Sequence, residues 1–157
     1  MVEVRDLKPI EEYSPEELLD QLRRHYAHLL FTTLAFLRER GVDPQEWMAH
    51  WGQASVSSWA FIQGDGPDTM MYWLLLNLAA GGARVRQVSI TPRRAEALVS
   101  DWPGGDPGRA LRKAIPPSEL DGLYDRFRPV AATLGLTFEH RPQGDAVRLV
   151  IAEDRRR

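Results

Sequence analysis

Between Thr69 and Ile90 the sequence reads TMMYWLLLNLAAGGARVRQVSI. The residues Met70–Ala80 are long enough for a helix and are apolar apart from Asn77. Gly81-Gly82 ends this segment, and residues 84–90 have the composition of a strand. A helix that is apolar all round has to be covered on several sides. We therefore expect the helices before this segment and the strands after it to pack around it.

Length and composition predict one globular domain that covers residues 1–157. A chain of 157 residues, with 43% apolar and 27% charged residues, can bury one sizeable core. The net charge of −2 offers no general attraction to nucleic acid or acidic membranes, so neither is expected as a partner. There is no cysteine, which excludes disulfides, thiolate metal sites and cysteine nucleophiles.

The first residues and the longest apolar run indicate where the protein is located. Met1–Tyr13 carries charges throughout, unlike a secretory signal. The uninterrupted apolar run Met70–Leu76 is far shorter than the roughly 20 residues that span a bilayer. We therefore expect a cytoplasmic protein.

Two helix starts precede the apolar segment. Ser14–Glu17 combines a capping serine, a proline at the first helical position and a glutamate three residues after the cap, and helical spacing then continues to Gly41. Asp43–Glu46 repeats the start signal for a second helix. The segment Ala54–Ile62 fits either a further helical turn or a short extended segment. Asp68 is well placed to cap the central helix.

Hairpins dominate the second half of the chain. Residues 84–91 and 94–102 flank a Pro92-Arg93 turn, and their alternation changes phase near Arg86-Gln87. This pattern predicts an antiparallel hairpin with a bulge. Its inward-facing residues are expected to be Val85, Val88 and Ile90. Residues 136–141 and 147–151 alternate cleanly around a second turn at residues 142–145, which predicts a second hairpin.

Helical segments are predicted between the two hairpins. Arg109–Ala114 has the length of one helical turn, and Pro117–Leu134 predicts a longer helix with a kink at Pro129. The order is therefore helix, helix, helix, hairpin, helix, hairpin. We expect an α+β fold in which the helices pack on an antiparallel sheet of about four strands.

Histidines are the candidates for catalysis. His50 lies four residues after Glu46, so a carboxylate could orient its imidazole as a general base, although the same spacing is common on exposed helices. His25 and His28 lie three residues apart and could supply two metal ligands, but no third ligand completes a metal site, and they predict a polar helix face instead. His140 alternates with inward-facing strand residues, which predicts a hydrogen-bonded core histidine.

Asn77 is the strongest candidate for a ligand site. Its amide could form a structural hydrogen bond to a helix terminus or loop, or it could anchor a ligand in a pocket with aromatic walls. The candidate ligand-binding residues are Trp59, Phe61, Tyr72, Trp73, Asn77 and His50. The same aromatic residues could equally form the core or a homodimer interface.

In the order of its elements the chain resembles the group of ligand-binding domains that includes 4-vinyl reductases and haem nitric-oxide-binding domains. The likeness rests on the helical first half, the hairpin at 84–102, the helix at 118–134 and the hairpin at 136–151. The Tyr-x-Ser-x-Arg haem signature is missing and no cysteine serves the metal-associated versions, so no functional residue is carried over. The resemblance implies a small-molecule or lipid-like ligand between the helices and the sheet.

Three functions remain open from the sequence. The first is a small-molecule-binding or sensory module for an apolar ligand, with no cofactor and no metal. The second is a cofactor-free hydrolase or lyase that uses His50 or His25 as its base. The third is a structural protein that buries its tryptophans in a homodimer. No serine lies in a Gly-x-Ser-x-Gly elbow, and no motif specifies a catalytic residue.

Overall fold

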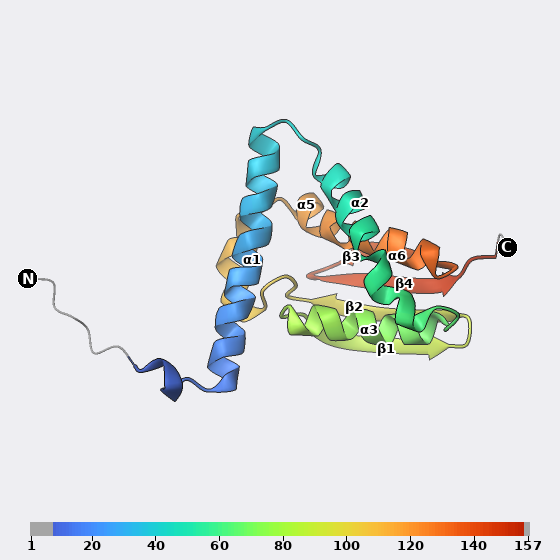
Figure 1. The fold of residues 1–157 in the computed structure, drawn as a ribbon, viewed down its shortest axis with the longest axis horizontal. Coiled ribbons are helices and arrows are strands. Elements are labelled where there is room, and N and C mark those ends of the chain that lie inside the picture. Colours follow the sequence, from blue (N-terminus) through green and yellow to red (C-terminus); the bar gives the residue numbers. More distant parts are fainter. Residues whose placement is uncertain (1–7, 156–157) are drawn as a thin grey trace, which may run out of the picture.

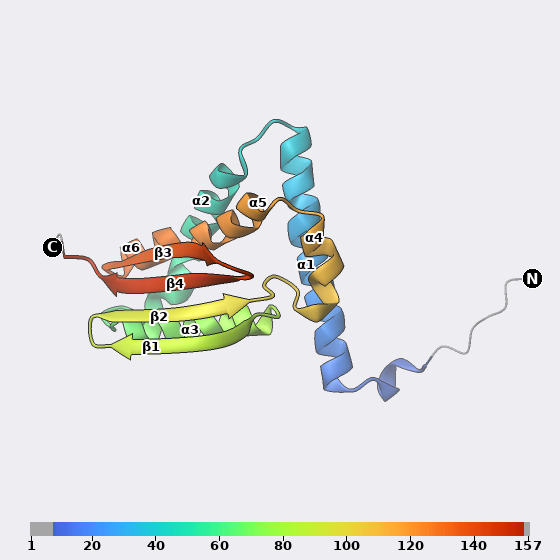
Figure 2. The ribbon, with the colours of Figure 1, turned by 180° about the vertical axis from the view of Figure 1, so that it is seen from behind.

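The computed structural model describes residues 8–155 and has the α+β fold that the sequence predicts (Figure 1). Four antiparallel strands form one sheet in the order β1-β2-β4-β3. Helices cover one face of this sheet, and Figure 2 shows the other face without a helix. The first part of Met1–Tyr13, where the sequence predicts no secretory signal, lies outside the described residues.

The elements follow the predicted order. The helical elements, with 3₁₀ helices labelled η, are η1 (Ile10–Glu12), α1 (Pro15–Glu39), α2 (Pro44–Ser55), η2 (Val56–Ile62), α3 (Pro67–Ala80), η3 (Asp106–Gly108), α4 (Arg109–Lys113), α5 (Pro117–Gly122), η4 (Leu123–Arg126) and α6 (Phe127–Thr133). The strands are β1 (Arg84–Thr91), β2 (Arg94–Ser100), β3 (Leu136–Gln143) and β4 (Ala146–Glu153). Residues 56–62, which the sequence left open, are therefore helical. Within residues 8–155, no helix combines the length and apolar character needed to cross a membrane.

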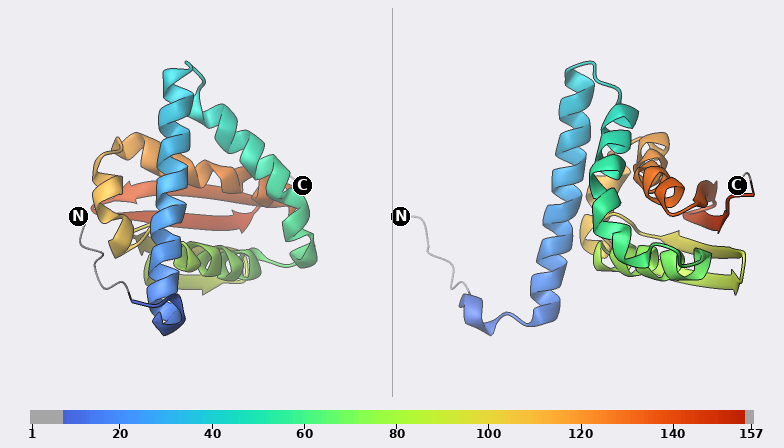
Figure 3. Two further views of the ribbon diagram at one scale, coloured as in Figure 1. Left: turned by 60° about the vertical axis from the view of Figure 1, so that its left-hand side comes forward. Right: turned by 45° about the vertical axis from the view of Figure 1, so that its right-hand side comes forward.

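The predicted start of α1 is confirmed. Ser14 Oγ accepts a hydrogen bond from the backbone N–H of Glu17, and the Glu17 carboxylate accepts one from the backbone N–H of Ser14. The helix stands across one end of the sheet, with α4 packed beside it (Figure 3). Only one side of α1 is buried, so an apolar stripe on its other side remains exposed.

The prediction that Asp68 caps α3 is wrong. The helix begins at Pro67, and the capping residue is Gly66, which makes no side-chain capping bond. Proline has a fixed φ and no N–H to satisfy, so it favours the first helical position. The helix therefore starts two residues earlier than expected, and Asp68 falls in its first turn.

The expectation that α3 is covered on several sides is also wrong. Met70, Met71, Leu74 and Leu78 are fully buried against the sheet and the neighbouring helices. On the other side of the helix, Tyr72 is 62% exposed. This happens because α3 lies along the edge of the molecule, over β1 and β2 (Figure 1).

The first hairpin has its predicted bulge, because the register of β1 and β2 shifts between Val85 and Gln87. The predicted burial of Val85, Val88 and Ile90 is wrong, since these residues are 38%, 47% and 54% exposed. β1 is an edge strand, and α3 also packs over β2 and β4, so the outer side of β1 is left uncovered.

The predicted single helix at 117–134 is divided into α5, η4 and α6. The interruption is the 3₁₀ helix η4, which lies before Pro129 rather than at it. Pro129 has no N–H for the carbonyl of Asp125, so a regular α-helix could not have continued its bonds through this segment. η4 packs against α2 and carries Tyr124 and Arg126.

Gly52 forms the tightest contact between α2 and the η4–α6 segment. A Cβ atom at this position would lie 2.3 Å from the carbonyl oxygen of Arg126 and 2.9 Å from Cγ of Pro129. The carbonyl is part of the backbone and the proline ring is closed onto the backbone, so neither group can rotate away. Only glycine allows α2 to approach the backbone that carries Arg126.

The variant Gly52→Ala is expected to destabilise the protein by about 1–3 kcal/mol, because overpacking forces α2 away from η4. Urea unfolding followed by circular dichroism measures this loss. The matched control is Gly122→Ala, whose Cβ would meet only the movable amide end of Gln45. The control should stay within about 0.5 kcal/mol of wild type. Equal stability of the two variants would contradict the role assigned to Gly52.

Candidate functional site

Two cavities on the helical side of the molecule share the lining residues Asn77 and Arg126. The small cavity, of about 180 Å³, is also lined by Ser55, Ser58, Trp59, Phe127 and Val130. The large cavity, of about 340 Å³, is also lined by Leu22, Arg23, Tyr26, Trp51, Ala80 and Gly81. We call them together the Arg126 cavities. Helical segments and their ends supply all of these residues.

Arg126 is a cation held by aromatic rings. Its guanidinium carbon lies 3.9 Å from the ring centroid of Trp51, 4.4 Å from that of Phe127 and 5.5 Å from that of Trp102. The Nε atom is sealed from solvent and makes no hydrogen bond. Burial lowers the pKa of Arg126, and among residues 8–155 only tyrosines, not carboxylates, act against this effect.

Tyr26 and Trp102 complete the surroundings of the guanidinium. Burial raises the pKa of Tyr26, and the Arg126 guanidinium and the Trp102 indole, which face its hydroxyl, reduce that rise. The Trp102 Nε1 atom is sealed from solvent and makes no hydrogen bond. A buried donor without an acceptor costs about 1–3 kcal/mol. This part of the molecule therefore has an excess of N–H donors and of positive charge.

Asn77 lines both cavities from α3. Its Nδ2 atom donates a hydrogen bond to the carbonyl oxygen of Trp73 at 3.0 Å. The residue is exposed, so its amide carries no burial penalty. The predicted hydrogen bond to a helix terminus or loop is therefore wrong: Asn77 bonds to a carbonyl inside its own helix, and it also lines the two cavities.

The structure brings together only some of the predicted site residues. Trp59 is buried and lines the small cavity. Trp73 stacks edge-on with Phe61 and Tyr72, at centroid distances of 5.1 Å and 5.4 Å. These three residues and the exposed His50 lie outside the lining of both cavities. Residues five apart on a helix point about 140° away from each other, so Tyr72 and Asn77 do not face one pocket.

Sequence reasoning missed Arg126, although a signal was present. Arg126 follows Leu123 by three residues and precedes Val130 by four. At helical spacing this places a charged residue on an apolar stripe. Trp51 and Tyr26 carried no comparable signal, because an aromatic residue on an apolar helix face is ordinary.

The other histidines have separate environments. His25, His28 and His50 are exposed. His140 Nε2 lies 2.8 Å from Asp125 Oδ1, but its Nδ1 is sealed from solvent without a hydrogen-bond partner, so this core histidine is satisfied on one side only. Burial would raise the pKa of Asp125, but hydrogen bonds from Arg128 and His140 outweigh it and lower that pKa.

His140 and Asp125 have the hydrogen bond of a general-base pair. Neither residue lines the Arg126 cavities, so a substrate there would not reach the imidazole. In the described part of the chain, no group of three His, Asp or Glu side chains is placed to hold a metal ion.

The chemistry of the site rests on its donors and its walls. A guanidinium, an amide and the side chain of Tyr26 lie among aromatic and aliphatic side chains. Such a set suits an anion with an apolar body. No protein-family model matches the chain, and no curated protein matches its sequence at a significant level.

Proposed function

We propose that the protein is a small-molecule-binding module whose ligand is an organic anion with an apolar body. The observation that carries the proposal is Arg126, whose guanidinium lines two cavities and lacks a carboxylate partner among residues 8–155. A ligand carboxylate or phosphate can pair with such a group in two parallel hydrogen bonds. The proposed ligand therefore differs from the apolar ligand that the sequence predicts, because it also carries an acidic head group.

Arg126 is the cationic group best suited to bind that head group. The large cavity has a second arginine, Arg23, but its side chain donates to the carbonyl oxygens of Ala79 and Ala80 and pairs with Asp20. Arg23 therefore serves the C-terminal end of α3, where a cation is stabilising. Arg126 faces the Tyr26 hydroxyl, but among residues 8–155 it has no carboxylate or carbonyl partner.

Asn77 is the natural second donor to the head group. The hydroxyls of Ser55 and Ser58, which line the small cavity, donate to backbone carbonyls at 2.8 Å and 2.6 Å. Asn77 uses Nδ2 for the Trp73 carbonyl, but an amide nitrogen carries two hydrogens. The second hydrogen is available to a ligand between the two cavities.

The large cavity accommodates the apolar body of the ligand. Its volume of about 340 Å³ falls in the usual range of small-molecule sites. Leu22, Tyr26, Trp51 and Ala80 supply aliphatic and aromatic walls. A chain or ring bound there would displace water from these surfaces, which favours binding.

The variant Arg126→Met tests whether Arg126 serves binding or folding. Methionine keeps the apolar stem of the side chain but removes the uncompensated charge, so the free energy of unfolding without ligand should be unchanged or raised by up to about 2 kcal/mol. Urea unfolding measures it. A loss of about 2 kcal/mol or more would show that the protein needs the cation for its fold.

Ligand binding is tested with decanoate, decyl phosphate and decanol in titration calorimetry. The two anions should bind at least about tenfold more tightly than decanol, because only they compensate Arg126. Arg126→Met should remove this preference. The control Arg93→Met, in the exposed β1–β2 turn, should leave it unchanged. Equal binding of decanol and decanoate to wild type would refute the proposal.

Self-association is a second candidate function, and α1 is the surface that favours it. Leu22, Leu29 and Phe36 recur every seven residues and are 63%, 64% and 54% exposed. This spacing is typical of a helix that packs on another helix. In an antiparallel pair, the acidic first turn of α1 would lie beside the basic last turn of its partner. The tryptophans, by contrast, already pack in the core of one copy.

A homodimer through α1 predicts that Leu29→Glu is monomeric in sedimentation velocity at micromolar concentration, where wild type sediments as a dimer. Leu29 is chosen because it lines neither cavity. Ile90→Glu, on the exposed edge strand, is the control and should remain dimeric. A monomeric wild type would exclude this function.

A further inference from the structure

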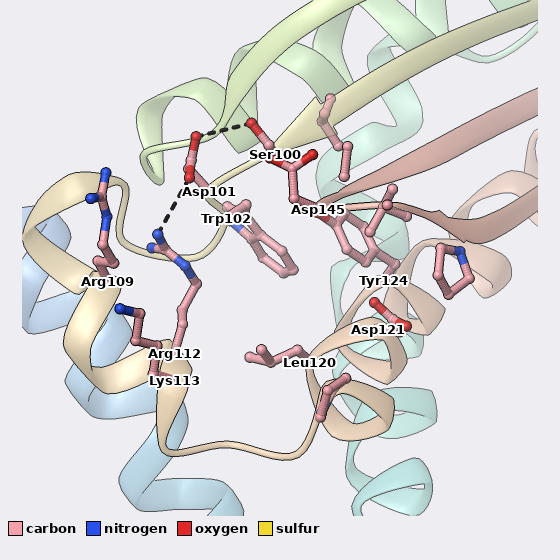
Figure 4. Close-up of a pocket in the computed structure, with 16 residues that line it drawn as sticks. Ser100, Asp101, Trp102, Arg109, Arg112, Lys113, Leu120, Asp121, Tyr124 and Asp145 are labelled. Carbon is pink, nitrogen blue, oxygen red and sulfur yellow. Dashed lines mark hydrogen bonds and ion pairs between the residues drawn. The ribbon is translucent and has the colours of Figure 1, made fainter.

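A charged cleft of about 330 Å³ lies where α4, α5 and the ends of β2 and β4 meet. It shares no lining residue with the Arg126 cavities. Figure 4 shows the basic side chains of α4 on one side of the cleft and Asp121 on the other, with Leu120 between them. Three basic residues, Arg109, Arg112 and Lys113, and three acidic residues, Asp101, Asp121 and Asp145, line it.

Two of the three basic groups are already engaged. Arg109 forms an ion pair with Asp106 in the preceding turn. Arg112 donates to the carbonyl oxygens of Pro103 and Gly105 at 2.8 Å and 2.6 Å, and it lies 3.6 Å from Asp101. Lys113 has no ion pair or hydrogen bond with any residue of the described chain, 8–155.

Two of the three carboxylates are engaged in the same way. Asp145 accepts two hydrogen bonds from Arg86, at 2.8 Å and 2.7 Å. Asp101 accepts a hydrogen bond from Ser100 and faces Arg112. Among the residues that the structure describes, no side chain forms an ion pair or hydrogen bond with Asp121.

Asp121 has the surroundings of a group that binds a cation. It is half-buried and lies beside the buried ring of Tyr124 (Figure 4). Burial raises the pKa of Asp121, and the neighbouring His140 reduces that rise. Burial raises the pKa of Tyr124 as well, and the Asp121 carboxylate adds to the rise. A carboxylate beside aromatic faces is a common arrangement for binding an ammonium group.

We propose that the cleft is a second binding site, for a small zwitterion whose ammonium group binds Asp121 beside Tyr124 and whose carboxylate binds Lys113. The two unpaired groups have opposite charge and come from opposite sides of the cleft. With three cations balancing three anions in the lining, a ligand without net charge keeps the cleft neutral. This proposal does not depend on the function proposed for the Arg126 cavities.

The test uses ω-amino acids of increasing length: glycine, β-alanine, 4-aminobutyrate and 6-aminohexanoate. Trp102 lines the cleft, so its indole N–H resonance in ¹H–¹⁵N spectra reports occupancy. At least one zwitterion should shift this resonance to saturation. It should bind about tenfold more tightly than butylamine, which lacks the carboxylate, or butyrate, which lacks the ammonium group, because each of these forms one ion pair fewer. An unshifted resonance with the whole series overturns the proposal, as does butylamine binding equally well.

Two variants test separately how the two ends of the ligand bind. Asp121→Asn should weaken zwitterion binding about tenfold and abolish butylamine binding. Lys113→Met should also weaken zwitterion binding about tenfold, and it should abolish butyrate binding. Asp65→Asn and Arg93→Met, which change exposed charges in distant turns, should leave every affinity unchanged. Unaltered zwitterion binding in Asp121→Asn overturns the proposal.

The stability of Asp121→Asn shows independently whether the carboxylate is unpaired. The pKa of Asp121 is higher in the folded protein than in the unfolded chain, so ionisation of this residue lowers the free energy of unfolding. The loss grows as the pH rises above the unfolded pKa and is complete above the folded pKa. Asp121→Asn should therefore unfold at a higher temperature than wild type at neutral pH. Below the unfolded pKa, about 3.9, the difference should vanish. A lower unfolding temperature at neutral pH would reveal a partner for Asp121 and overturn the proposal.

Discussion

The helical layer depends on the direct contact between Gly52 of α2 and the backbone of Arg126. Because no side chain separates them, α2 lies directly on η4. This contact brings Trp51, the residue before Gly52, over the guanidinium of Arg126 at 3.9 Å. One packing constraint thus fixes both the helix arrangement and the central group of the Arg126 cavities. The same glycine that permits the fold also positions the cation.

An arginine held by aromatic rings is less stable than one held by acids. Rings compensate a cation by about 0.5–2 kcal/mol each, and the loss of solvation on burial is larger. Elsewhere the chain satisfies its partly buried arginines with oxygen atoms, as Arg112 and Arg23 show. Arg126 departs from this pattern, and it lines both of the Arg126 cavities. An anion bound there would supply the missing oxygen atoms.

Local patterns in the sequence predicted where the helices and strands lie, whereas contacts between distant segments decide which of their faces are buried. The capping box at Ser14, the bulge near Arg86 and the two hairpin turns depend on a few neighbouring residues, and all were predicted correctly. The exposure of β1 and of one side of α3 depends on which elements lie beside them, which no local pattern contains. Asn77 was found because it is polar in an apolar helix. Arg126 was missed because its aromatic surroundings come from Trp51 and Trp102, which are distant from it in the sequence.

Trp102 connects the two ligand sites that the structure suggests. Its ring lines the charged cleft and contacts the Tyr124 ring, with centroids 4.8 Å apart and planes tilted by 49°. Its Nε1 atom lies 2.9 Å from where a Cβ on Gly81 would lie, and Gly81 lines the large cavity. A ligand that moved Arg126, whose guanidinium carbon lies 5.5 Å from the Trp102 ring centroid, would act on the same ring that a zwitterion in the cleft would contact. If one ligand alters the affinity for the other through this ring, the reverse effect must have the same size.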